Sequence, residues 1–159
     1  MTAWVVACSP LDAPPEEWPD LPPSAGLVAH AVIEEVHTAG YSGIRERQRR
    51  VIRTSSDWEA FWIAFHGPVE PMPTPPAVNF AERMVLVAAM GQRPTGGYGI
   101  EIGSVYAADG KLLARVEERS PDSNCGTTQA LTAPVTAVVI PRSSATVEFQ
   151  DRALTVSCG

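Results

Sequence analysis

One short segment concentrates side chains and backbone features that suit contact with another molecule. Arg93 offers a guanidinium and Tyr98 a rigid phenol ring, which are both common anchors in protein interfaces. Pro94 fixes its own φ, whereas Gly96 and Gly97 permit conformations that other residues avoid. We therefore predict a shaped loop that binds a protein partner rather than only a tight turn. The predicted contact residues are Gln92, Arg93, Pro94, Thr95, Gly96, Gly97 and Tyr98.

No spacing in the sequence specifies a catalytic site. The run from Gly40 to Ile44 approaches the Gly-x-Ser-x-Gly turn of hydrolases, but it lacks the final glycine and no helix is expected after it. The glycines at Gly97, Gly99 and Gly103 approach a dinucleotide-binding loop, but a strand follows where a helix should begin. We predict a protein that is not an enzyme and uses no cofactor, with a convergent catalytic site as the minor alternative.

The histidines and the adjacent carboxylates also lack the spacing of a reactive site. His30, His37 and His66 show no ligand pattern, so we predict no metal site. Neighbouring residues of a strand point to opposite faces, so the pairs Glu34–Glu35 and Glu117–Glu118 are expected to face apart, on solvated surfaces.

The formal net charge of −6 argues against a nucleic-acid surface, which needs clustered cations. One basic cluster exists, between residues 45 and 53. We predict that it forms a solvated strand edge, with an anionic partner as the second interpretation. The cluster contains Arg45, Arg47, Arg49, Arg50 and Arg53.

The three cysteines point to an exported protein. The residues that end at Cys8 resemble a bacterial lipobox, in which the cysteine becomes acylated, although most of a signal peptide is missing. This interpretation requires a basic and apolar segment ahead of Met1, and otherwise the match is chance. Cys125 and Cys158 would form a disulfide in an oxidising compartment, or they are two small buried thiols.

Fifteen prolines divide the chain into parts. We predict a signal or lipobox remnant at residues 1–8, a semi-rigid proline-rich tether at 9–25 and one β domain at 26–159. The predicted location is the cell envelope, with the protein lipid-anchored, periplasmic or secreted. A lipid anchor would be its only contact with the membrane.

Only one helix is expected. A capping box begins at Ser56, and aromatic residues then recur at helical spacing up to the stop at Gly67. We assign that aromatic face, Trp58, Phe61, Trp62 and Phe65, to the core.

Strands are expected over most of the remaining domain. An unbroken apolar run at 84–90 predicts a strand covered on both faces, and Asp109–Gly110 predicts a tight hairpin, with a bulge at Gly103. Further strands are predicted at 27–38, 131–140, 145–149 and 153–157. The predicted class is mainly β (α+β), an antiparallel sandwich or barrel with one amphipathic helix capping an end.

Several motifs occur in the order found in the PrcB C-terminal domain family. They are Asn79–Phe80, Gln92–Ile102, Cys125, Thr128–Thr132 and Pro134. The chain resembles this family from about Val51 to its C-terminus. The resemblance implies a non-catalytic accessory domain, which in the type member is needed for the stability of a secreted protease complex.

A second, shorter similarity suggests another function. The string from Pro94 to Tyr98 is similar to a loop of chagasin-like cysteine protease inhibitors, although a glycine stands here at the middle position. We therefore carry two hypotheses, an envelope module that binds a protease complex and an inhibitor that inserts this loop into an active-site cleft.

Overall fold

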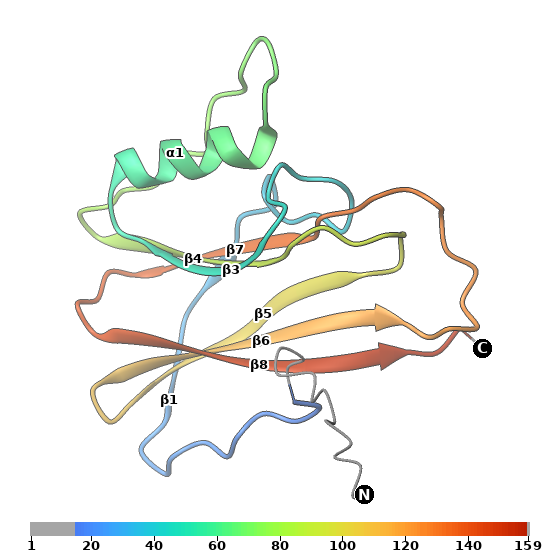
Figure 1. The fold of residues 1–159 in the computed structure, drawn as a ribbon. Helices are drawn as coiled ribbons and strands as arrows, with labels where there is room; N and C mark the ends of the chain where they lie inside the picture. The colour runs from blue at the N-terminus through green and yellow to red at the C-terminus, as the bar shows by residue number, and fades with distance from the viewer. Residues whose placement is uncertain (1–14, 159) are drawn as a thin grey trace, which may run out of the picture.

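The chain folds into two four-stranded β-sheets and one helix (Figure 1). The computed structural model describes residues 15–158. Sheet A has the strand order β1-β5-β6-β8, and sheet B has the order β2-β7-β4-β3. The elements are β1 (Gly26–Val28), β2 (Ala31–Val32), β3 (Arg47–Ile52), α1 (Ser55–His66), β4 (Arg83–Met90), β5 (Gly99–Ala108), β6 (Lys111–Pro121), β7 (Val135–Pro141) and β8 (Thr146–Val156).

The elements stack in three layers, with sheet B between sheet A and α1 (Figure 1). One core fills the space between the sheets and a second core lies between sheet B and the helix. Strand β4 supplies Met84, Leu86 and Ala88 to the first core, and Val85, Val87 and Ala89 to the second. This confirms the prediction of a strand that is buried on both faces.

The mainly β prediction is therefore confirmed as a sandwich, and the described residues form no closed barrel. Two details differ from the expectation. The helix lies across the outer face of sheet B rather than at an end of the sandwich (Figure 1). In addition, β6 and β8 run parallel to each other, while the other strand pairs are antiparallel.

The helix buries the four aromatic side chains as predicted, but it begins earlier than expected. Thr54, not Ser56, is the N-cap: its hydroxyl accepts a hydrogen bond from the Asp57 amide at 3.2 Å. The cap is shifted because the extended backbone at Thr54 lets its short side chain turn back to the third helical residue. At the other end, the Gly67 amide donates to the Ile63 carbonyl, which confirms the predicted stop.

The β5–β6 hairpin agrees with the sequence in detail. Asp109 and Gly110 both have positive φ, at 50° and 76°, which matches the twist of a tight two-residue turn. The strand register shifts between Ile102 and Ser104, so Gly103 is the predicted bulge. The turn and the bulge depend on residues that are neighbours in the chain, which explains why the sequence pattern predicted both positions.

Two strand predictions were wrong, and the strand predicted at 131–140 begins later, at Val135. Residues 27–38 do not form one strand, because the chain crosses from β1 in sheet A to β2 in sheet B. Residues 145–157 were predicted as two strands separated by Asp151 and Arg152, but β8 continues through both residues. Their charges are neutralised there by ion pairs to Arg49 and Glu117, so no turn is needed to expose them.

The described part of the proline-rich segment, residues 15–25, lies against sheet A. Trp18 Nε1 donates to the Val116 carbonyl at 3.1 Å, and the Arg152 guanidinium stacks 3.7 Å from the Trp18 ring centroid. The Ala153 amide donates to the Pro15 carbonyl at 2.7 Å. These contacts attach the segment along β6 and β8, while the division of the chain at residue 25 stays a prediction.

Candidate functional site

The segment Gln92–Tyr98 connects β4 to β5 and is held against a second loop, residues 122–134, which connects β6 to β7. The Arg93 amide donates to the Thr132 carbonyl at 2.7 Å, and the Thr132 amide donates back at 3.0 Å. The Gly96 amide donates to the Thr128 carbonyl, and the Thr132 hydroxyl donates to the Thr95 carbonyl. The two loops therefore form one hydrogen-bonded unit, which we call the paired loops.

The glycines of the first loop allow close approach to the chain itself. A Cβ atom at Gly96 would lie 2.3 Å from Thr128 Oγ1, so a side chain at this position would force Thr128 to move. Gly97 has a φ of 89°, and a Cβ there would lie 3.0 Å from Pro121. The close contacts that these two glycines permit are therefore contacts within the protein itself.

Arg93 and Tyr98 also support the loop from within. The Arg93 guanidinium lies 5.7 Å from the Tyr98 ring centroid, and its Nη2 donates to the Met90 carbonyl at 3.0 Å. Tyr98 packs against the core between the sheets, and both side chains are half-buried. The structure thus does not present them outward as freely as the sequence interpretation assumed.

The exposed residues at this end come from three loops. Gln92, Pro94 and Gly97 are exposed among the predicted contact residues. The sequence interpretation missed Leu131, which is 54% exposed, and Tyr41, which is 58% exposed. We call these five residues the loop-end surface. A large apolar residue between polar or small neighbours was the signal that could have identified both missed positions.

A third loop brings Tyr41 to this surface. The Ala133 amide donates to the Gly40 carbonyl, and the Ser42 hydroxyl donates to the Ala133 carbonyl, each at 2.8 Å. Ser42 is 2% exposed, so the serine of the near-hydrolase motif holds two loops together.

A disulfide fixes the second loop to the end of β8, as predicted. Cys125 and Cys158 are bonded, and the Asp122 amide donates to the Val156 carbonyl at 3.0 Å. A cavity of about 240 Å³ lies beside this bond and is lined in part by Gly97 and Thr128. The disulfide therefore supports the paired loops from the opposite side.

Two arginines of the basic cluster are not part of a solvated edge, whereas Arg45 is exposed. Arg47 and Arg49 reach from β3 in sheet B to Glu118 and Asp151 in sheet A. Arg47 Nε donates to Glu118 Oε1 at 2.8 Å, and Arg49 Nε donates to Asp151 Oδ1 at 2.8 Å. Glu118 is 4% exposed. These four residues, which we call the inter-sheet ion cluster, join the two sheets, and their arginines are not free to bind an anionic partner.

Glu117 points to the other face of β6 and is also buried rather than solvated. Its carboxylate pairs with Arg119 and Arg152. Burial by itself would raise the Glu117 pKa, but the hydrogen bonds from Arg152 and Arg119 outweigh it and hold that pKa below its usual range. The adjacent glutamates therefore face apart, as predicted, but each neutralises a different set of arginines.

The histidines lie apart from one another. His37 Nδ1 is 3.2 Å from Thr136 Oγ1, whereas His66 packs edge-on against Trp62 and Phe65. Across residues 15–158, no three His, Cys, Asp or Glu side chains gather in a way that could hold a metal ion. No helix in the same range is long and apolar enough to cross a membrane. The predicted lipidation site, Cys8, lies outside the described residues.

Comparison with known proteins supports the resemblance to a family. Residues 84–141 match the family model described as PrcB C-terminal, which confirms the resemblance over the segment from β4 to β7. No curated protein matches the chain, and no solved structure matches it either. The matched segment contains both paired loops.

Proposed function

We propose that this protein is a non-catalytic protein-binding module of the cell envelope and an accessory or stabilising subunit of a secreted protease complex. The observation that carries the proposal is the match of residues 84–141 to the PrcB C-terminal family. That segment contains Gln92–Tyr98 and the loop that holds it in place. The family match therefore covers the loop that the sequence analysis predicted to contact a partner.

The partner contacts the loop-end surface. Hydrogen bonds to Thr128 and Thr132 fix the first loop before binding, so little conformational entropy remains to be lost on association. Leu131 and Tyr41 provide exposed apolar area beside it. Arg93 and Tyr98 act mainly by stiffening the loop, and the exposed atoms of Gln92, Pro94 and Gly97 make the contact.

A location outside the cytoplasm agrees with the disulfide, because such bonds persist in oxidising compartments. Attachment through an acylated Cys8 would place the module at the membrane surface without any spanning segment.

The structure gives a reason to prefer an accessory role over inhibition. An inhibitor of the chagasin-like kind would insert Pro94–Tyr98 into the active-site cleft of a protease. The Gly96 amide and the Thr95 carbonyl are already bonded to the second loop. Insertion that used these groups would first break the paired loops.

A crosslinking experiment in the native envelope tests the proposal. We compare the wild type with Leu131→Glu and with Ile63→Glu, which changes a residue of nearly equal exposure (56%) on the outer side of α1. Wild type and Ile63→Glu are expected to capture a subunit of a protease complex, and Leu131→Glu to lose most of that capture while keeping the wild-type circular dichroism spectrum.

Equal capture of the same subunit by Leu131→Glu would remove the loop-end surface from the interface. The purified wild type is also titrated against a panel of serine and cysteine proteases. Stoichiometric inhibition there would replace the accessory role with the inhibitor hypothesis.

A further inference from the structure

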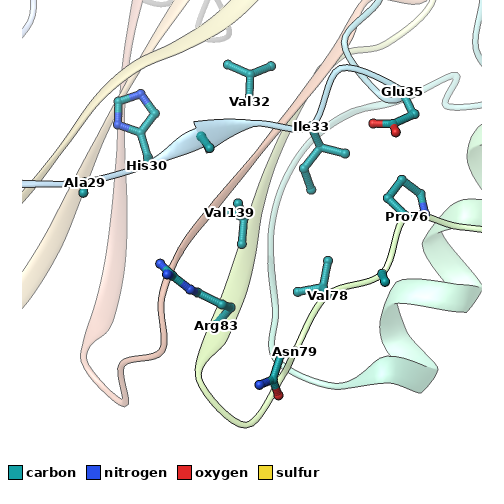
Figure 2. A pocket seen from close by; sticks show the side chains of 12 residues that line it. Ala29, His30, Val32, Ile33, Glu35, Pro76, Val78, Asn79, Arg83 and Val139 are labelled. Carbon is teal, nitrogen blue, oxygen red and sulfur yellow. The ribbon is translucent and has the colours of Figure 1, made fainter.

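A groove of about 560 Å³ lies on the side of sheet B that carries the helix, and no residue of the paired loops lines it (Figure 2). It is bounded by β2 on one side and by residues 76–79, which lead from α1 to β4, on the other. Ile33, Val78 and Val139 supply apolar walls. A cavity of this size is large enough for side chains of a bound ligand.

The groove opens beside a strand edge that no other strand of residues 15–158 pairs with. Within that range β2 is the last strand of sheet B, and its one partner is β7. The Ile33 amide donates to the Ala137 carbonyl at 2.9 Å, so the backbone bonding groups of Ile33 point to β7. Bonding groups alternate along an antiparallel strand, so the amide and carbonyl of the preceding residue, Val32, point to the open edge. Among the described residues, these groups could accept a further strand.

The polar residues around the groove are separated by charge. Figure 2 shows Arg83 and Asn79 towards one end and Glu35 at the other. Arg83 is exposed and forms no ion pair with the rest of residues 15–158. The Asn79 side-chain oxygen accepts from the Ala81 amide at 3.1 Å, and its NH₂ group has no hydrogen-bond partner among residues 15–158. This end of the groove is therefore suited to a carboxylate.

We propose that this groove binds an extended peptide of a partner protein, which adds a strand to β2 and carries an apolar side chain followed two residues later by an acidic one. Residues two apart in a strand share a face. The apolar side chain would enter the groove between Val78 and Val139, and the carboxylate would bind Arg83.

This site is independent of the proposed function, because it uses no residue of the loop-end surface. The probe is a peptide of seven residues with both ends capped, mostly β-branched, with a central leucine and an aspartate two positions later. Its binding to the full chain is measured by titration calorimetry. A second peptide carries asparagine in place of the aspartate.

The expected result is saturable binding of the aspartate peptide that weakens about tenfold to a hundredfold in Arg83→Ala. The asparagine peptide should bind the wild type about tenfold to a hundredfold more weakly than the aspartate peptide does. The Arg83→Ala substitution should not weaken binding of the asparagine peptide any further. Arg45→Ala, which removes another exposed arginine, should bind as the wild type does. Val32→Pro should also weaken binding, because proline removes the amide at the open edge but leaves the bonds to β7.

Leu131→Glu should retain full peptide binding, which separates failure of this inference from failure of the proposed function. Equal affinity of both peptides for the wild type, or undiminished binding by Arg83→Ala, would overturn the inference. Octanoate is tested as a small apolar carboxylate. Saturable octanoate binding that depends on Arg83, without binding of the aspartate peptide, would also overturn it.

Discussion

Glu118→Gln is the substitution that most directly tests how the two sheets are joined. The wild-type carboxylate is almost fully buried and faces the guanidinium groups of Arg47 and Arg49. Glutamine has nearly the same shape but no charge. The variant therefore leaves two arginines with Asp151 as their only carboxylate partner in the inter-sheet ion cluster.

The expected loss follows from burial. Breaking a buried ion pair by removing one partner costs about 3 to 5 kcal/mol, because the remaining charge stays desolvated and uncompensated. Asp151 still contacts both arginines, so we expect the lower end of that range, about 3 kcal/mol. For a chain of this size, such a loss lowers the melting temperature by about 6 to 12 °C.

The measurement is urea unfolding of the oxidised protein at neutral pH, with the free energy of unfolding taken from the midpoint and the slope. Glu101→Gln is the matched control, since its carboxylate also binds an arginine, at 3.0 Å, but its side chain is 47% exposed. That control should lose less than about 1 kcal/mol. High salt should reduce the effect of the control more than that of Glu118→Gln.

A loss below about 1 kcal/mol for Glu118→Gln, with an unchanged slope, would refute the reasoning. It would mean that the arginines at β3 are effectively solvated and that the cores between the layers join the sheets without help from the charges.

Three further predictions concern the helix face, the paired loops and the stability of the protein at acidic pH. Trp62→Ala should lower the free energy of unfolding by about 3 to 5 kcal/mol, because the side chain is 4% exposed and its Nε1 donates to the Pro73 carbonyl at 2.7 Å. A loss below about 1 kcal/mol in thermal unfolding would contradict this. Gly96→Ala should destabilise the protein by about 1 to 3 kcal/mol, because the added Cβ clashes with the Thr128 hydroxyl. In a double-mutant cycle, Thr128→Ala should restore part of that loss, and purely additive effects would exclude this contact. Glu117 has a lowered pKa in the folded state, so its stabilisation is present above the usual carboxyl pKa of about 4.3 and is lost as the pH falls through the lowered value. The stability difference between wild type and Glu117→Gln, measured from pH 7 to pH 3, should therefore shrink towards acid, and a constant difference would contradict it.

The features that the sequence located correctly are those decided within a few residues. The aromatic spacing from Trp58 to Phe65 identified a buried helix face, because one turn of helix brings those side chains together. The apolar run of β4 indicated burial on both faces, and Asp109–Gly110 indicated the hairpin. The helix start was predicted wrongly, at Ser56 instead of Thr54, because both residues carry a hydroxyl that can cap a helix.

Partner binding by Gln92–Tyr98 stays a prediction, and the sequence did not show how this loop is held in place. Gln92–Tyr98 does form a stiff loop, but its stiffness comes from bonds to Thr128 and Thr132, and its exposed neighbours include Leu131 and Tyr41. Those neighbours lie in other loops, so no local pattern could place them beside it.

The sequence by itself determined the mainly β class, the helix and its core face, and the central strand, and it left the Cys125–Cys158 disulfide as one of two alternatives. Only the tertiary structure decided which charges are buried. Arg47 meets Glu118 across 71 residues of sequence and Arg49 meets Asp151 across 102, so each looked like a solvated charge when taken alone. A charge can be buried when an opposite charge lies within hydrogen-bonding distance, and that distance is set by how the sheets pack, not by the residues next to it in the chain.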